Sequence, residues 1–404
     1  MQKATNVVAG LDIGTGFIKV LVAAQKDESP TFEVISQIKE PSFGVRKGVV
    51  IDTNKVSRII QILLSKVREE TGNKVDSVFT NISGSHLFCS NSKGMVAVSR
   101  ADQKISELDI SRVLESAKTI SLPSNNEILE VLPREFAVDN ENGVKEVIGM
   151  HGGRLEVEAL ILAAFSPYVN NLSQSVLGSN LRIADVVPSA VASGSAVLTP
   201  QQKELGVAVL DIGSGTSELA VFEEGELIHL AVFPMGSANI SNDIAIGLRT
   251  DVDTAEMIKI EKGVCSLRGG DKKEKIEIEG EEPVVFSQKI LGRIIEARVS
   301  EIFGEVQKEL KKISRQGLLP AGIVLTGGGA KMAGLVEFAK KELKLPCRIG
   351  KPTNFIGLEN ELEFATVCGL VMKGMDAELP SKSISWPAKG LGEKIKRFLK
   401  IFIP

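Results

Sequence analysis

Apolar and polar residues alternate along two segments of the chain that resemble each other. The first is VVAGLDIGTGFIKVLVAA at residues 7–24, and the second is GVAVLDIGSGTSELAVFEEG at residues 206–225. Each has an apolar run that ends in Asp, a turn of Gly with Thr or Ser, and a second run of alternating character. Two such runs joined by a short glycine turn are typical of a β-hairpin. The pattern therefore predicts two hairpins in a duplicated context.

Further stretches show the spacing of other elements. Residues 287–312 repeat apolar positions at helical spacing and predict a long amphipathic helix. Residues 322–343 predict a strand, a triple-glycine turn and a helix, and the charge-dense residues 266–286 predict an exposed hairpin. Residues 84–164 predict a small α/β module, whose helix is indicated by the helical spacing of Leu108, Val113, Leu114 and Ala117.

The C-terminal stretch KGLGEKIKRFLKIFIP, residues 389–404, predicts an amphipathic helix with an apolar face and a basic face. Residues 375–388 before it hold two prolines, several serines and Trp386 with little periodicity, which predicts a linker. A helix beyond a linker favours contact with a lipid surface over docking on the core. Both an interfacial anchor and a residue packed on the body fit Trp386. The candidate membrane residues are Trp386, Leu391, Lys394, Ile395, Lys396, Arg397, Phe398, Leu399, Lys400 and Phe402.

Composition and charge narrow the class of protein. With 404 residues, 43% hydrophobic and 25% charged, the chain is typical of a globular protein with more than one core. No apolar run approaches the roughly 20 residues that span a bilayer, and the four cysteines lack CxxC spacing, so we expect a reduced, cytoplasmic protein without a zinc site. The net charge is −3, but residues 389–404 carry five basic side chains and one acid, so the rest carries −7. This balance argues against a general nucleic-acid binder.

The glycine turns carry the candidate chemistry. Glycines let backbone N–H groups approach phosphate oxygens, and a Thr or Ser hydroxyl adds a donor. Asp12 and Asp211, each at the end of an apolar run, suit Mg²⁺ held through water, because magnesium keeps most of its hydration shell. A triple-glycine turn ahead of a helix lets the chain pass close under a nucleoside. The candidate cofactor-binding residues are Gly14, Thr15, Gly16, Gly213, Ser214, Gly215, Thr216, Gly327, Gly328, Gly329 and Lys331.

Through these three loops the chain resembles the actin, sugar-kinase and heat-shock-chaperone ATPase superfamily. That fold holds ATP in a cleft between two lobes, each built on a mixed five-stranded sheet. The resemblance implies a phosphate contact for Lys19, seven residues after Asp12, and ribose contacts for Glu256 and Lys259 in the segment TAEMIKIEKG. An i,i+3 contact on the surface of a helix also explains the pair Glu256 and Lys259.

One position departs from the superfamily pattern. In many members a Glu or Gln before a Pro, at the start of a helix of small residues, orients the attacking water. Here Val187 stands before Pro188, and a valine cannot position water. Asp185 points to the same side of the predicted strand and is a candidate catalytic substitute, although a polar residue near a strand end explains it equally.

Residues 84–164 contain three characteristic stretches: KTISLP at 118–123, EILEVLPREFAVD at 127–139 and GVKEVIGMHGGRLEVEALI at 143–161. Through these stretches the chain resembles the FtsA family of bacterial cell-division proteins. This resemblance implies an α/β, actin-like two-lobed fold of duplicated ribonuclease H-like domains, with an inserted subdomain 1C and a C-terminal amphipathic helix. The implied divisions are 1–83 with 165–199 and 355–374 (lobe I, subdomain 1A), 84–164 (1C), 200–236 with 305–354 (lobe II, 2A), 237–304 (2B), 375–388 (linker) and 389–404 (membrane-targeting helix).

The family resemblance also implies a function. It implies a protein that binds ATP and Mg²⁺, polymerises, and tethers FtsZ filaments to the inner face of the cytoplasmic membrane at the division site, with weak or absent hydrolysis. Subdomain 2B is implied to take the C-terminal peptide of FtsZ, for which Lys289, Arg293 and Arg298 are candidate contacts. Subdomain 1C is implied to meet other division proteins, the C-terminal helix to meet anionic lipid, and no nucleic acid is implied.

Two other functions of the same superfamily stay open. A small-molecule kinase needs a clear catalytic carboxylate and has no use for a basic amphipathic end. A PilM-like scaffold of pilus assembly shares the actin core and a similar inserted module, but lacks this kind of terminal membrane helix. Deletion of residues 385–404 separates the cases, because only the tether requires those residues for membrane association.

Overall fold

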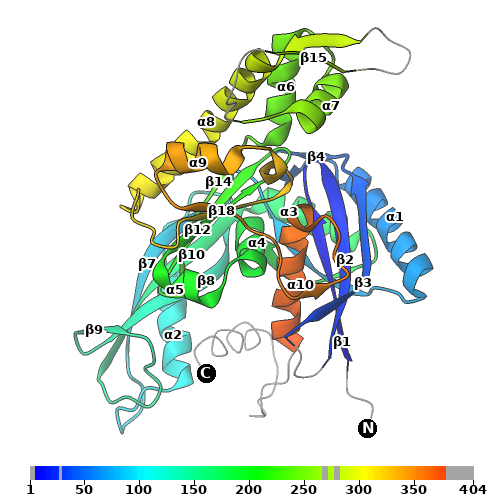
Figure 1. Ribbon diagram of the computed structural model, residues 1–404. Coiled ribbons are helices and arrows are strands. Elements are labelled where there is room, and N and C mark those ends of the chain that lie inside the picture. Colours follow the sequence, from blue (N-terminus) through cyan, green and yellow to red (C-terminus); the bar gives the residue numbers. More distant parts are fainter. Residues whose placement is uncertain (1–4, 27–29, 266–271, 277–282, 379–404) are drawn as a thin grey trace.

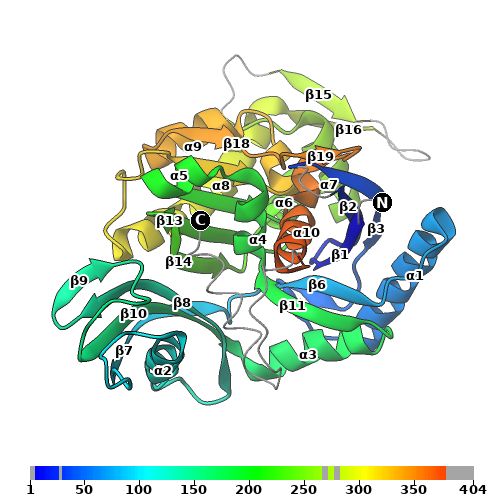
Figure 2. The same cartoon turned by 90° about the horizontal axis from the view of Figure 1, so that it is seen from below.

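The computed structural model describes residues 5–26, 30–265, 272–276 and 283–378. Two large sheets with flanking helices form two lobes, a smaller sheet lies below them, and a mainly helical subdomain lies above (Figure 1). The view from below places the small sheet and its helix beside strand β14 of one lobe (Figure 2), in agreement with the contacts between β7 and β14.

Lobe I is built on a six-stranded sheet in the order β11-β6-β1-β2-β3-β19. It has one strand more than the resemblance implies, because the two-residue strand β19 pairs with the edge of β3. The first predicted hairpin is confirmed: β1 and β2 pair antiparallel up to Ile13 opposite Ile18. The elements are β1 (Thr5–Ile13), β2 (Phe17–Lys26), β3 (Phe32–Pro41), β4 (Val45–Arg46), β5 (Val49–Val50), α1 (Thr53–Thr71), β6 (Ser77–Ile82), α3 (Ser166–Leu177), β11 (Arg182–Pro188), β19 (Phe355–Ile356), η2 (Glu361–Phe364) and α10 (Ala365–Glu378).

Lobe II is built on a five-stranded sheet in the order β14-β13-β12-β17-β18. The second predicted hairpin, β12 with β13, is confirmed and ends with Ile212 opposite Ser217. The predicted long helix is also confirmed, because α8 begins at Gln288 and ends at Lys312. The elements are α4 (Ser189–Val197), α5 (Pro200–Leu205), β12 (Val207–Ile212), β13 (Ser217–Glu223), β14 (Glu226–Phe233), α8 (Gln288–Lys312), β17 (Ile323–Thr326), η1 (Gly328–Lys331), α9 (Leu335–Leu343) and β18 (Cys347–Ile349).

Helices α4 and α10 lie between the two large sheets and share one core with both. Val8 of β1, Val209 of β12 and Val367 of α10 belong to the same buried cluster. The two helices cross closely at Gly369, where a Cβ would stand 1.7 Å from the carbonyl oxygen of Ala192. The lobes are therefore joined through a tightly packed helix pair, and Gly369 is required there because a side chain has no room.

The inserted module is a four-stranded sheet, in the order β7-β10-β8-β9, covered by α2. The predicted helix is confirmed as α2, which buries Val113, Leu114 and Ala117, whereas Leu108 is 62% exposed and Asp109 is buried. Asp109 accepts hydrogen bonds from the backbone N–H groups of Ser99 and Ser106, so its carboxylate caps the helix and turns Leu108 outward. The elements are β7 (Phe88–Ala97), α2 (Glu107–Ala117), β8 (Asn126–Val138), β9 (Glu141–Val144) and β10 (Arg154–Phe165).

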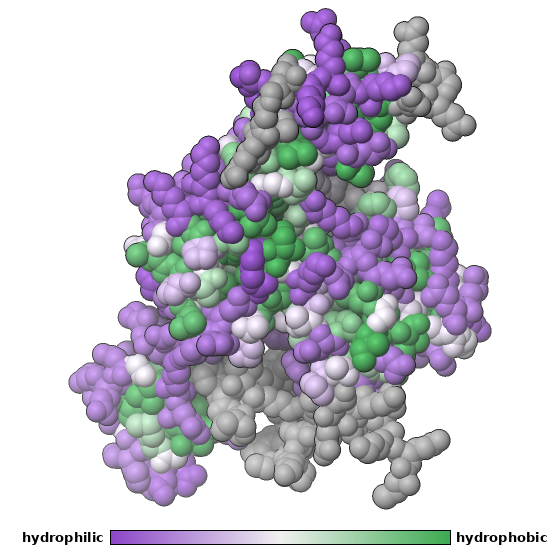
Figure 3. All heavy atoms as spheres, in the orientation of Figure 1, coloured by the Kyte–Doolittle hydropathy of each residue, from purple (hydrophilic) through white to green (hydrophobic). Residues whose placement is uncertain are grey.

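In the upper subdomain one short helix packs against α8, and a second short helix packs against the first. The predicted charge-dense hairpin is present as two short antiparallel strands, paired from Lys273 opposite Ser287 to Ile276 opposite Val284. Hydrophilic residues cover most of the face in Figure 3, including this subdomain, and apolar residues show mainly over the middle of the molecule. The elements are α6 (Ser237–Leu248), α7 (Val252–Lys262), β15 (Lys273–Ile276) and β16 (Val284–Ser287).

Two findings bear on the C-terminal region. Helix α10 continues to Glu378, so the first residues of the predicted linker at 375–388 are helical. Trp386 and all the candidate membrane residues in 389–404 lie outside the described residues. Within the ranges that the structure describes, no helix is long and apolar enough to cross a membrane.

Candidate functional site

The first glycine turn closes the β1–β2 hairpin. Gly14 N–H donates to the carbonyl oxygen of Phe17 at 3.1 Å, which makes the turn tight. Asp12 and Lys19 are directly opposite each other in the hairpin, and Lys19 Nζ lies 2.8 Å from Asp12 Oδ2. Burial acts to lower the pKa of Lys19, but the attraction of Asp12 and Asp211 outweighs it and raises the pKa. Lys19 is therefore a charged ammonium between the two aspartates.

The second glycine turn repeats this geometry on lobe II. Gly213 N–H donates to the carbonyl oxygen of Thr216 at 2.9 Å. Asp211 is buried, and Thr366 Oγ1 of α10 donates to its Oδ2 at 2.9 Å. Burial, with repulsion from Asp12, raises the pKa of Asp211. The two predicted metal-site aspartates thus lie close enough to influence each other, although they come from different lobes.

A third carboxyl group, Glu218, joins these aspartates and was not foreseen from the sequence. It lies opposite Asp211 in the β12–β13 hairpin and is only 4% exposed. Ser83 Oγ of lobe I donates to its Oε1 at 2.5 Å, and its Oε2 has no hydrogen-bond partner among the described residues. Burial, and then the charges of Asp211 and Asp12, raise the pKa of Glu218 to about 8. Glu218 is therefore mostly protonated at neutral pH.

The two glycine turns face each other across the lobe boundary. A Cβ at Gly16 would stand 2.9 Å from the Cβ of Ser214, and a Cβ at Gly215 would stand 2.6 Å from Cγ2 of Thr15. Any side chain at Gly16 or Gly215 would push the turns apart. The predicted phosphate-binding residues Gly14–Gly16 and Gly213–Thr216 are therefore brought together in one place.

The triple-glycine loop lies against the second hairpin. Gly327 has φ +84°, and a Cβ there would stand 2.3 Å from Oδ1 of Asp211. A Cβ at Gly329 would stand 2.4 Å from Cγ2 of Ile212, so the loop passes directly over the end of β12. Thr326 Oγ1, at the end of β17, is buried and unpaired within the described part of the chain. The loop thus borders the same interlobe site as the two turns.

Glu256 and Lys259, the predicted ribose pair, lie on α7 and contact the start of α6, which meets the second glycine turn. Lys259 is buried, and its Nζ donates to Ser237 O at 3.1 Å and to Ser241 Oγ at 2.9 Å. It also lies 2.6 Å from Glu256 Oε2, so the two residues do form the i,i+3 pair. Ser237 N–H in turn donates to Gly213 O at 2.9 Å. The pair therefore reaches the second turn through the start of α6 and is not an isolated surface contact.

Val187 and Asp185 lie on β11, the outer strand of the lobe I sheet. Val187 is buried and level with Asn81 of β6. Asp185 is level with Phe79, which pairs with Gly10 of β1, so Asp185 lies further back along the sheet than Asp12. The extra carboxyl group close to the two aspartates is Glu218, and a catalytic role for Asp185 stays a prediction.

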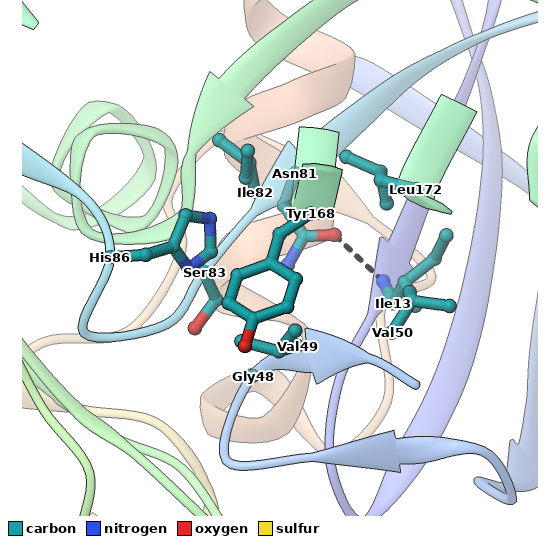
Figure 4. A pocket seen from close by; sticks show the side chains of 10 residues that line it. All are labelled: Ile13, Gly48, Val49, Val50, Asn81, Ile82, Ser83, His86, Tyr168 and Leu172. Atoms are coloured by element: carbon teal, nitrogen blue, oxygen red, sulfur yellow. Dashed lines mark hydrogen bonds between the residues drawn. The ribbon is translucent and has the colours of Figure 1, made fainter. Parts of the chain in front are cut away.

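A small pocket lies behind the first glycine turn, between β1, the β4–β5 hairpin, β6 and α3 (Figure 4). Asn81 Oδ1 accepts from Ile13 N–H at 2.7 Å, and Gly48 N–H donates to Thr15 Oγ1 at 2.9 Å. The rings of His86 and Tyr168 meet edge to face with centroids 5.0 Å apart, and burial lowers the pKa of His86 to about 4. These contacts hold the first turn from behind with neutral groups.

The residues present fit a nucleotide with hydrated Mg²⁺. Among the described residues, no three His, Cys, Asp or Glu side chains are grouped to ligate a metal directly. With a nucleotide and Mg²⁺ bound, Asp12 and Asp211 would offer acceptors to metal-bound water, and the glycine turns would offer backbone N–H donors to phosphate oxygens. Within the described ranges, the buried hydroxyl of Thr326 and Oε2 of Glu218 have no hydrogen-bond partner, as expected of groups that meet a ligand.

Comparison with known proteins agrees on one family. The family profile described as "Cell division protein FtsA" matches residues 208–369, and the profile described as "SHS2 domain inserted in FTSA" matches residues 84–163. The curated cell division protein FtsA of Pseudomonas aeruginosa is 35% identical over 386 residues, which cover 94% of this chain and 92% of that protein.

Solved structures confirm the expected actin-like fold. A chain of the PilM-PilN type IV pilus biogenesis complex has a TM-score of 0.65 at 18% identity and covers 91% of this chain and 98% of that chain. MreB 5 of Spiroplasma citri bound to AMPPNP has a TM-score of 0.54 at 13% identity and covers 90% and 94%. At these identities the likeness shows the fold alone.

Proposed function

The chain belongs to the FtsA family of cell division proteins, and on that premise we propose that it binds ATP with Mg²⁺ between its lobes, polymerises, and tethers FtsZ filaments to the cytoplasmic face of the cell membrane at the division site. The observation that carries the proposal is the meeting of the two glycine turns, with Asp12 and Asp211 beside them and the triple-glycine loop above. MreB 5, which shares the fold, is bound to AMPPNP in its solved structure.

Calorimetric titration with ATP tests the nucleotide site. We expect binding that weakens when EDTA replaces Mg²⁺, because Asp12 and Asp211 then face the phosphates without a cation between them. Gly215→Val should abolish binding, since its side chain collides with Thr15 of the facing turn. Gly304→Val, at a position of α8 where an added Cβ meets no atom within 4 Å, is the matched control for glycine loss. ATP binding that is indifferent to Gly215→Val contradicts this site.

We propose that ATP acts mainly as a cofactor of polymerisation. Val187 offers no group to orient water, and Glu218, with a pKa of about 8, is a poor acceptor of a proton at neutral pH. Turnover should therefore stay below about 1 s⁻¹, the low end for typical enzymes. Phosphate release measured with and without lipid tests this, and faster turnover contradicts it.

We propose that residues 389–404 bind anionic lipid. Their five basic side chains supply about 1 kcal/mol each near a charged surface, with modest apolar burial in addition. One such helix holds only reversibly, so a filament would line up many weak anchors and gain avidity. Phe398→Glu should abolish pelleting with phosphatidylglycerol vesicles and leave ATP binding intact. Phe43→Glu, which changes an exposed phenylalanine of the body, should leave pelleting unchanged.

We propose that subdomain 2B takes the C-terminal peptide of FtsZ. Its surface presents apolar side chains, with Ile246 78% exposed and Ile260 71% exposed, and α8 adds the exposed basic side chains of Lys289 and Arg293. Arg298 serves the fold instead, because its guanidinium binds both oxygens of Asp243 at 2.7 and 2.9 Å. Ile246→Glu and Arg293→Glu should each weaken binding of a labelled FtsZ peptide in fluorescence anisotropy. We propose that subdomain 1C contacts other division proteins.

The alternative of a PilM-like scaffold has one specific observation in its favour, the TM-score of 0.65 with a chain of the PilM-PilN complex. Deletion of residues 385–404 distinguishes the two functions. Loss of vesicle binding supports the tether, and unchanged vesicle binding supports the scaffold. The kinase alternative is tested by a coupled assay over candidate sugars, in which ATP consumption that depends on a sugar would favour a kinase.

A further inference from the structure

A row of charged side chains crosses lobe I towards lobe II. Asp12 of β1 lies opposite Lys19 of β2, and Lys19 lies opposite Lys39 of β3. Directly opposed residues of antiparallel neighbours point to the same side of the sheet, so these three side chains share one side. Lys39 Nζ lies 2.6 Å from Oε2 of Glu363, which extends the row with a fourth charge, opposite in sign to that of Lys39.

Glu363 carries this row across the lobe boundary. It lies in η2, just before α10, and its Oε1 pairs with Lys331 Nζ of the triple-glycine loop. Its Cγ lies 3.8 Å from the position of a Cβ at Gly328, so the carboxylate sits directly beneath that loop. Burial acts to raise the pKa of Glu363, but Lys331 and Lys39 outweigh it and lower the pKa. One charged carboxylate therefore joins a strand of lobe I to a loop of lobe II.

This inference rests on the proposed ATP site. We propose that Glu363 is a positioning residue that holds the triple-glycine loop of lobe II against lobe I and so slows the release of bound nucleotide. Gly327–Lys331 borders the interlobe site, and movement of this loop away from β3 requires the pair of Lys331 and Glu363 to break. The pair is charge-assisted and only partly exposed, with Lys331 43% and Glu363 20% exposed, so salt screens it incompletely.

The rate of nucleotide release tests this role. The full-length protein is loaded with a fluorescent ATP analogue and chased with excess ATP in a stopped-flow instrument. Glu363→Gln should release the analogue about tenfold faster, with little change in the association rate. Glu361→Gln is the matched control: it lies in the same short helix and pairs with Lys351 at 2.8 Å in a more exposed place, so its release should equal that of the wild type.

Two further variants separate a positioning role from general destabilisation. Lys331→Gln should also speed release, and the double variant with Glu363→Gln should be no faster than the faster single variant, because both remove one pair. Higher salt should speed release from the wild type more than from Glu363→Gln. In nucleotide-free protein, Glu363→Gln should increase hydrogen exchange of Gly328–Met332, and Glu361→Gln should not.

The outcomes distinguish this inference from the proposed function. A wild type that binds the analogue, with Glu363→Gln releasing it at the wild-type rate, overturns the role of Glu363 and leaves the ATP site intact. Equal acceleration by Glu361→Gln and Glu363→Gln also overturns it, because the effect then belongs to the helix and not to the pair. A wild type that binds no ATP analogue overturns the proposed function. In that case hydrogen exchange still tests the inference: unchanged exchange of the loop in Glu363→Gln shows that the pair of Lys331 and Glu363 does not restrain it.

Discussion

The two glycine hairpins have the same backbone pattern, but the residue opposite the aspartate is a lysine in one hairpin and a glutamate in the other. In the first hairpin Asp12 lies opposite Lys19, and in the second hairpin Asp211 lies opposite Glu218. The first aspartate is compensated by a cation at 2.8 Å, whereas the second faces a carboxyl group that stays protonated because its pKa is about 8. Similar backbones thus bury an aspartate in two ways, by an ion pair on lobe I and by neutralising the neighbour on lobe II.

The comparison predicts its largest effect at Lys19. Lys19→Met leaves Asp12 buried without its cation and should lower the free energy of unfolding by about 4 kcal/mol. Glu218→Gln, the matching change in the second hairpin, replaces a protonated carboxyl by an amide of similar shape and removes the cost of protonating Glu218 at pH 7, so it should not lower the free energy of unfolding. Urea denaturation without nucleotide measures both. Equal losses would show that the two hairpins are electrostatically alike.

The pH dependence of stability should differ between wild type and Glu218→Gln. The pKa of Glu218 is raised in the folded protein, so its contribution is fully present below the unfolded value and is lost as pH rises towards 8. Between pH 5 and 8 the wild type should therefore lose about 3 kcal/mol relative to Glu218→Gln. Urea midpoints at several pH values give this difference, in which the other titrating groups cancel. Parallel pH profiles would mean that Glu218 is ionised in the folded protein.

A smaller effect is expected at Thr366, because its hydroxyl stabilises the buried Asp211 by one hydrogen bond, whereas Lys19 stabilises Asp12 by an ion pair. Thr366→Val keeps the shape but removes the hydroxyl that donates to Asp211 at 2.9 Å, and should cost about 2 kcal/mol. Thr353→Val, at an exposed position, should cost less than about 0.5 kcal/mol. Denaturation at pH 7 compares the two. A loss at Thr366 no larger than at Thr353 would mean that Asp211 needs no hydrogen-bond donor.

The smallest effect concerns the bond between the lobes at Glu218. Ser83→Ala removes the donor to Glu218 Oε1 and should cost about 1 kcal/mol. The cost should persist in a Glu218→Gln background, because the amide oxygen also accepts from Ser83. Ser90→Ala, on an exposed part of β7, is the control and should be neutral. A cost that disappears in the Glu218→Gln background would show that Ser83 binds a charged carboxylate and not a neutral one.

The features that the sequence predicted well are those set by neighbours along the chain. Both hairpins follow from alternation around a glycine turn, and α8 follows from apolar spacing over many turns. Glu218 was missed although the signal was present: it stands seven residues after Asp211, as Lys19 does after Asp12. The glycines match in the two segments, but the residue at this position differs and distinguishes the two halves: it is Lys19 in the first and Glu218 in the second.

Other features depend on contacts that no local pattern carries. Leu108 has a helical spacing with the buried Val113 and Leu114, but the buried side chain at this end of α2 is Asp109, whose donor Ser99 comes from the segment after β7. The pair of Lys331 and Glu363 joins residues 32 positions apart and exists only because the two lobes are brought together. Such pairs become visible only when the sheets are placed in space.

Helix α10 has a mechanical consequence. It packs against α4 and against β1, β2 and β6, and it is the last described element before residues 379–404. A pull on the chain beyond Glu378 therefore enters the body at the seam between the lobes, along a helix gripped at Gly369 by α4. Force applied there has little leverage to swing one lobe away from the other. It would instead act along α10, whose Thr366 donates to Asp211 in the proposed nucleotide site.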